Sequence, residues 1–251
     1  QFCSGLLFAL PLLSEQSAIE LTGAVASAPY INLTLDALRE FGVTPSPSGS
    51  SYTVAPQAYC TPGKACVEGD WSNAAFWLCA GAMPKGDIAV SGLKLDSSQG
   101  DKKVADILAQ MGAKVGLRGA DVTVSESRRM AVEIDAAGIP DLVPILSCVA
   151  AVSRGTTTVV HAGRLRLKES DRIQAISATL GALGANIEQT QDGLLICGVR
   201  KLTGGTVDAF GDHRIAMMAA IASCCCQTPV TITGAQAVDK SYPTFWEDLQ
   251  S

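Results

Sequence analysis

Basic and acidic residues gather at two turns in the second half of the sequence. "RLRLKESDR" carries Lys168, Glu169 and Arg172, and "FGDHRIAMMAAIAS" places Asp212 and Arg214 directly before a run of small apolar residues. A helix start exposes backbone N–H groups that attract anions, and cations placed there strengthen the attraction. Carboxylates beside them can transfer protons. The residue types therefore indicate a site for a small polyanion with acid–base chemistry.

Ordinary helix capping is the alternative interpretation of the same residues. A charge run usually marks a solvated helix start, here with Ser170 or Glu169 as the cap. Asp141 and Asp212, each taken alone, fit N-caps better than ligands. Arg214 fits capping poorly, because a cation in the first turn opposes the helix dipole and needs an anion to offset it.

A repeat of about 71 residues places these turns. Asp70, Asp141 and Asp212 are 71 residues apart, each precedes an apolar helix, and Gln1 stands near the same point one repeat earlier. Each helix is followed by a β-branched strand, an amphipathic helix and a strand pair. The predicted unit is βαβαββ, and such units bury their faces only by packing around shared helices. We expect three full units from about residue 64 onward, preceded by part of another.

The start of the second helix differs among the repeats. The second repeat has "SSQGD", which is ordinary capping chemistry, whereas Lys240 of the fourth repeat follows Lys168 of the third by 72 residues. Two repeats thus present a cation at the same point of the fold. We predict one shared cleft that is formed by Asp141, Lys168, Glu169, Arg172, Arg214 and Lys240.

Composition excludes several classes of protein. The chain of 251 residues is 47% hydrophobic and 17% charged with a net charge of −5, which argues against disorder and against nucleic-acid binding. No apolar run reaches the roughly 18 residues of a membrane span. The nine cysteines lack metal-ligand spacing, so they are predicted to be buried thiols in a reducing cytosol, with no metal site. The opening "QFCSGLLFALPLL" is typical of a buried helix inside a longer protein, and the chain is expected to be a fragment.

The motifs resemble those of one enzyme family over the whole chain. "LKESDRI", then "GDHRIAMMAA" forty residues later, with "IPD" upstream and "SAPYI" near the start, resemble 5-enolpyruvylshikimate-3-phosphate synthases. The resemblance implies a two-lobed α/β fold of repeated βαβαββ units packed around buried helices, with the first lobe incomplete. Residues 1–68 would be the carboxy-terminal part of the first lobe, and residues 69–251 the second lobe with three units.

The resemblance also implies a reaction. The family transfers the enolpyruvyl group of phosphoenolpyruvate to the 5-hydroxyl of shikimate 3-phosphate and releases phosphate. This is a cytoplasmic step of aromatic amino acid (chorismate) biosynthesis and the target of glyphosate. The resemblance also implies that the protein uses no metal or organic cofactor, binds no nucleic acid or membrane, and is a monomer at full length.

Roles for single residues follow from the resemblance as well. Asp141 would accept the proton of the 5-hydroxyl, Glu169 would protonate the methylene carbon, and Lys168 would lie at the reacting centre against shikimate 3-phosphate. The residues that would hold phosphoenolpyruvate are Arg172, Arg214 and Lys240, with Asp212 and His213 in support. The residues that would contact shikimate 3-phosphate are Gln1, Ser27 and Tyr30.

Two other functions stay open at this point. The related transferase that acts on UDP-N-acetylglucosamine uses a loop cysteine, and Cys60 and Cys66 flank "TPGKA" here. A non-catalytic module could be built from the same repeat, but it would not need the clustered cations and carboxylates. The family's amino-terminal anion-binding loops do not occur in this sequence, so the chain alone is expected to have an incomplete active site.

Overall fold

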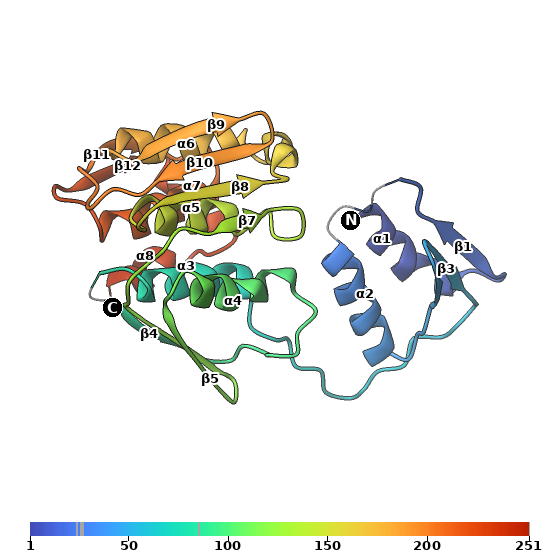
Figure 1. The fold of residues 1–251 in the computed structure, drawn as a ribbon. Helices are drawn as coiled ribbons and strands as arrows, with labels where there is room; N and C mark the ends of the chain where they lie inside the picture. Colours follow the sequence, from blue (N-terminus) through green and yellow to red (C-terminus); the bar gives the residue numbers. More distant parts are fainter. Residues whose placement is uncertain (24, 26–27, 85, 251) are drawn as a thin grey trace. The chain divides into compact units, whose positions relative to one another are not determined.

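The computed structural model describes residues 1–250 apart from 24, 26, 27 and 85. The chain divides into two compact units, Gln1–Glu68 with Asp96–Gly100, and Gly69–Leu95 with Asp101–Ser251. In Figure 1 the first unit is mainly blue and the second ends in red. No helix within the described residues is long and apolar enough to cross a membrane. The assignment of 1–68 and 69–251 to lobes of a longer enzyme stays a prediction.

The first unit packs two helices on a small antiparallel sheet. Its elements are α1 (Phe2–Ala9), the 3-10 helix η1 (Leu10–Leu12), β1 (Ser17–Glu20), α2 (Ala28–Glu40), β2 (Ser46–Ser48) and β3 (Ser51–Val54), with strand order β1-β3-β2. Its core includes Leu7, Ile19 and Leu38. The expectation of a buried first helix is wrong, because α1 buries Leu7 but leaves Phe2 94% exposed.

The second unit contains one complete copy of the predicted repeat. Its elements are β7 (Glu133–Asp135), α5 (Val143–Ala151), β8 (Thr156–Val160), the 3-10 helix η3 (Gly163–Leu167), α6 (Arg172–Ala182), β9 (Asn186–Thr190) and β10 (Gly193–Cys197). The strands form one sheet in the order β7-β8-β10-β9. β7 and β8 are parallel because a helix connects them, whereas β10 pairs antiparallel with both neighbours.

The flanking copies are shorter than expected. The earlier copy has α3 (Trp71–Gly81), β4 (Asp87–Val90), η2 (Gly100–Lys102), α4 (Lys103–Gln110), β5 (Lys114–Arg118) and β6 (Asp121–Ser125). The later copy has β11 (Gly205–Asp208), α7 (His213–Ser223), β12 (Val230–Thr233), η4 (Ala235–Lys240) and α8 (Phe245–Gln250). Within the described residues, the first lacks a strand before α3 and the second lacks the closing hairpin. Three full copies were therefore too many.

The first helices of the three copies form the core of this unit. All of α5 is buried, as is α7 from His213 to Ala222, and α3, α5 and α7 contact one another pairwise. Small apolar residues on every side of these helices allow such close packing. Figure 1 shows α5 and α7 running side by side.

The cysteines are only partly buried. Cys79, Cys148 and Cys225 are buried, whereas Cys60, Cys66, Cys197 and Cys224 are exposed, and all nine are free thiols. Burial raises the pKa of the three core thiols, which keeps them protonated and unreactive. Among the described residues no group of His, Cys, Asp and Glu has the geometry of a metal site.

The second helices end in the same way in three repeats. Gly42, Gly112 and Gly184 follow α2, α4 and α6 and adopt positive φ angles of 80°, 94° and 91°. In each case the next residue's N–H donates to the carbonyl five residues before it, at 2.9 Å. A residue with a Cβ is strained in this conformation, so glycine is the suitable C-cap. Glycine at these three positions therefore ends the second helices of the repeats.

Candidate active site

The site is built around Arg172, the first residue of α6. Asp171 is the N-cap of this helix and accepts a hydrogen bond from the backbone N of Gln174 at 3.1 Å, so the cap is neither Ser170 nor Glu169. Asp171 thus caps the N-terminus of α6. The helix directs Arg172 into the protein, where its side chain is 1% exposed. A charge that is buried this deeply requires partners of opposite sign.

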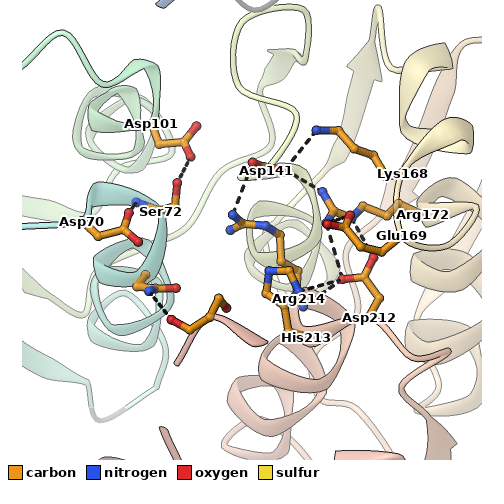
Figure 2. A network of polar contacts seen from close by, with 12 residues as sticks. Asp70, Ser72, Asp101, Asp141, Lys168, Glu169, Arg172, Asp212, His213 and Arg214 are labelled. Atoms are coloured by element: carbon orange, nitrogen blue, oxygen red, sulfur yellow. Dashed lines mark hydrogen bonds and ion pairs between the residues drawn. The ribbon is translucent and has the colours of Figure 1, made fainter. Parts of the chain in front are cut away.

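Three carboxylates, which lie just before α5, α6 and α7, bind the Arg172 guanidinium (Figure 2). Its Nη1 lies 2.6 Å from Asp141 Oδ1, its Nη2 2.7 Å from Glu169 Oε2 and its Nε 2.8 Å from Asp212 Oδ2. The planar fork of N–H donors suits this arrangement, which a lysine could not reproduce. Burial acts to lower the pKa of Arg172, but the carboxylates outweigh it and raise the pKa above its usual value.

Asp141 faces the cations and is not the N-cap residue of α5. The N-cap of α5 is Leu142, without a side-chain cap bond. Besides Arg172, Asp141 contacts Lys168 Nζ at 3.5 Å and Arg214 Nη2 at 3.3 Å. Burial alone would raise the pKa of Asp141, but the charges of Arg214, Lys168 and Arg172 lower it well below its usual value. The group is therefore a carboxylate at neutral pH.

Asp212 joins the helix cap to the charge network. Its side chain is fully buried, and its Oδ1 accepts the backbone N–H of Arg214 at 2.9 Å, as an N-cap does. Its Oδ2 accepts bonds from Arg172 and from the Ser170 hydroxyl, the latter at 3.1 Å. Capping and a place in a charged site were alternatives in the sequence, and Asp212 both caps α7 and pairs with Arg172.

Glu169 and Lys240 form a further ion pair of the cluster. Lys240 is the last residue of η4, and its Nζ lies 2.8 Å from Glu169 Oε1. Burial acts to raise the pKa of Glu169, but the hydrogen bond from Lys240 and the charge of Arg172 lower the pKa to about 2. All six residues predicted to share a cleft thus lie in one connected network of ion pairs.

Several buried nitrogen atoms of this network have no hydrogen-bond partner in the described part of the chain. They are Nε and Nη1 of Arg214 and Nδ1 of His213. Buried polar atoms in folded proteins are nearly always paired, so unpaired ones next to a charge cluster suggest a place for a ligand. Burial and then the charge of Arg214 lower the pKa of His213, which therefore stays neutral at physiological pH. The two free guanidinium donors favour an anion.

The remaining predicted residues belong to the first unit. Gln1 is the N-cap residue of α1 without a side-chain cap bond, and Tyr30 lies in α2 with 44% of its surface exposed. Ser27 lies outside the described residues. The helices are joined by a hydrogen bond of 2.7 Å between the hydroxyls of Thr34 and Ser4. The role of these three residues stays a prediction.

Asp101 belongs to the segment "SSQGD", which the sequence suggested to be ordinary capping. Asp101 is 6% exposed and accepts a hydrogen bond from the Ser72 hydroxyl. Burial raises the pKa of Asp101 to about 6, with Asp141 raising it and Arg214 lowering it through their charges. Asp101 stands 71 residues before Arg172, so the repeat itself pointed to a position facing the site. Figure 2 shows the pair across from Asp141 and Arg214.

Comparison with known proteins identifies the family of this chain. Residues 1–249 match the model of the family described as EPSP synthase (3-phosphoshikimate 1-carboxyvinyltransferase). The chain belongs to the EPSP synthase family. The resemblance of its motifs to that family is confirmed, and so is the α/β fold of enolpyruvyl transferases.

Relatives of the EPSP synthase family cover the chain from end to end. A 3-phosphoshikimate 1-carboxyvinyltransferase of Clostridium acetobutylicum is 45% identical over 251 residues, which is all of this chain and 58% of the relative. One of Clostridium kluyveri is 45% identical over 259 residues and is covered to 59%. The chain thus spans somewhat over half the length of these relatives.

Solved structures show the same partial coverage. An EPSP synthase from Acinetobacter baumannii superposes with a TM-score of 0.85 at 26% identity, over 97% of this chain and 58% of that one. The enolpyruvyl transferase NikO from Streptomyces tendae has a TM-score of 0.78 at 18% identity, a likeness of fold alone.

Proposed function

We propose that a full-length protein carrying this chain transfers the enolpyruvyl group of phosphoenolpyruvate to the 5-hydroxyl of shikimate 3-phosphate and releases phosphate. The observation that carries the proposal is the buried Arg172, which pairs with both Asp141 and Glu169. Asp141 also pairs with a second cation, Arg214. Family membership supports it. The relatives' names also favour this reaction over transfer to UDP-N-acetylglucosamine and over a non-catalytic module.

Phosphoenolpyruvate binds to the cations of this cluster in the proposal. Arg214 has two buried donors free for a carboxylate or phosphate, and Lys240 is 56% exposed and can reach a ligand. Arg172 supplies positive charge from the interior. The cluster has four cations, Lys168, Arg172, Arg214 and Lys240, against the three carboxylates Asp141, Glu169 and Asp212, so it has a net attraction for anions.

Glu169 and Asp141 act as the acid and the base. The proton that Glu169 donates goes to the methylene carbon, the 5-hydroxyl oxygen bonds to the neighbouring carbon, and Asp141 takes the hydroxyl proton. Glu169, now a carboxylate, then takes one proton from the methyl group as phosphate leaves, which restores the double bond. Lys168, 3.5 Å from Asp141, stabilises the negative charge that develops at the reacting centre.

Anion binding prepares both carboxyl groups for these steps. In the ligand-free site, cations hold the pKa of Glu169 at about 2, far too low for a proton donor at neutral pH. When substrate anions bind Lys240 and the arginines, the positive charge is shared with them and the pKa of each carboxyl group rises. The acid and base therefore become effective only when the substrates are bound.

The rest of the proposal extends the same reading to the longer protein. Gln1, Ser27 and Tyr30 contact shikimate 3-phosphate. The enzyme is a cytoplasmic monomer of chorismate biosynthesis that needs no cofactor. The 251 residues alone turn over little substrate, because they span about 58% of their relatives and further anion-binding groups are needed for two highly charged substrates.

A phosphate-release assay with both substrates tests the proposal. In the full-length protein, Asp141→Asn or Glu169→Gln should lower turnover by roughly a hundredfold or more, the scale of a lost acid–base group. Glu188→Gln is the matched control, because it removes an exposed carboxylate on β9. Near-normal turnover in both site variants, or substantial turnover by the 251 residues alone, would contradict it.

A further inference from the structure

The segment that carries Lys240 is fixed by a helix of another repeat. Two side chains of α3 bind the two residues that follow Lys240. Asn73 Nδ2 donates to the backbone carbonyl of Ser241 at 3.1 Å, and Trp77 Nε1 donates to the Tyr242 hydroxyl at 3.1 Å. Asn73 and Trp77 are four residues apart and so lie on one face of α3.

Aromatic packing makes this attachment rigid. The rings of Trp77 and Tyr242 meet edge to face with centroids 6.4 Å apart, and the fully buried ring of Phe245 lies 5.5 Å from Trp77 and 5.6 Å from Tyr242. Edge-to-face and tilted arrangements of this kind are favourable beyond the buried area. The hydrogen bonds and rings together fix the backbone directly after Lys240.

Lys240 needs such an attachment. It ends η4, a 3-10 helix of six residues, and helices of this type have poor hydrogen-bond geometry and seldom hold a position by themselves. Its own side chain is 56% exposed and forms an ion pair with Glu169 at 2.8 Å. The direction of the ammonium group therefore depends on where the backbone of residues 240–242 is held.

We propose that Asn73 and Trp77 are positioning residues that hold Lys240 against Glu169 and, in the ligand-bound enzyme, against the anionic substrate. The inference rests on the proposed function for its ligand but not for the ion pair. A helix of the earlier repeat thereby sets the geometry of a cation in the later repeat. Neither residue touches the reacting atoms.

Binding of phosphoenolpyruvate to the full-length protein, measured by calorimetry, tests this positioning. Asn73→Ala should raise Kd about threefold to tenfold, the scale of one lost hydrogen bond, and Trp77→Phe should act in the same direction. Lys240→Met should raise Kd at least as much. In the double variant, Asn73→Ala should add nothing to Lys240→Met, because it acts through Lys240. An equal factor for Asn73→Ala in both backgrounds would mean a general structural effect and would overturn the proposal.

A ligand-free measurement separates this inference from the proposed function. In a crystal structure of the Asn73→Ala variant, the Lys240 ammonium should have moved away from Glu169, and an unchanged ion pair of 2.8 Å would overturn the positioning role. If the ion pair is lost but Lys240→Met leaves Kd unchanged, the positioning role stands and the proposed binding role of Lys240 fails. Tyr242→Phe, which removes the hydroxyl that accepts from Trp77 and also pairs with Asp248, serves if Asn73→Ala does not fold. Ser125→Ala, which breaks a 2.8 Å bond to Asp87 in the β4–β6–β5 sheet, is the stability control.

Discussion

Helices α3 and α7 start with the same geometry but different chemistry. Asp70 accepts the backbone N–H of Ser72 at 2.8 Å, and Asp212 accepts that of Arg214 at 2.9 Å. At the second helical residue, Ser72 gives its hydroxyl to Asp101, whereas Arg214 directs its guanidinium to Asp141. The repeat thus fixes where a side chain is presented, and the residue type at that position decides whether it makes a hydrogen bond or an ion pair.

The starts of the second helices differ in how a buried charge is accommodated. Arg172 stays charged because three carboxylates surround it. Asp101 has the Ser72 hydroxyl and a more distant Arg214, so burial dominates and raises its pKa to about 6. A buried ionisable group is either paired or neutralised by a proton. Arg172 shows the first solution, whereas Asp101 keeps a proton only up to about pH 6 and carries a poorly paired charge above it.

Among the variants that test this comparison, Arg172→Met should cause the largest loss of stability. It leaves Asp141 and Asp212 buried without their shared partner, and breaking a buried ion pair costs about 3–5 kcal/mol. Urea unfolding of the full-length protein measures the loss. Arg166→Met is the matched control, because Arg166 is 33% exposed and pairs with Asp171 at the same turn, where the loss should be about 1 kcal/mol or less. Equal losses of unfolding free energy in the two variants would mean that the ion pairs of Arg172 contribute no more than a surface ion pair.

Asp101→Asn should stabilise the protein at neutral pH. Between the ordinary pKa of an aspartate and about 6, the folded state keeps a proton that the unfolded state releases. Wild-type stability therefore falls as pH rises through this window and stays lower above it. Asparagine does not ionise, so the variant should gain up to about 3 kcal/mol at pH 7.5 relative to wild type, and little at pH 4.

Thermal unfolding at several pH values measures this gain. Asp106→Asn, an exposed acid on α4, should show no comparable pH dependence. A stability difference between Asp101→Asn and wild type that does not change with pH would contradict the assigned ionisation.

Asp70→Ala should have the smallest effect. It removes a helix cap outside the ion-pair network, which costs about 1 kcal/mol. Asp212→Ala removes the same cap from α7 together with a partner of Arg172, and should cost several times more. Denaturant midpoints of the two variants compare the positions directly, and equal shifts would show that Asp212 is only a cap.

Much of the fold was predictable because its signals are local. The strands, the hairpins and the glycine caps at 42, 112 and 184 follow from periodicity and backbone preference. The cluster was predictable because the repeat aligned Lys168 with Lys240 and Asp141 with Asp212. The pairing of side chains within the cluster could not be predicted, because it depends on contacts such as that of Arg172 with Asp212, forty residues away. The shortened flanking repeats were missed because the regular spacing of Asp70, Asp141 and Asp212 says nothing about how many strands surround each helix.

Binding of phosphoenolpyruvate to Arg214→Met and Ser72→Ala variants of the full-length protein tests the central claim most directly. The two residues occupy the same position of equivalent helices, and only Arg214 has free buried guanidinium donors. Arg214→Met should raise Kd at least about tenfold, because a charge-assisted bond to the anion is lost, whereas Ser72→Ala should change it less than about twofold. An unchanged Kd for Arg214→Met, or equal losses for both variants, would contradict the assignment of this cluster as the anion site.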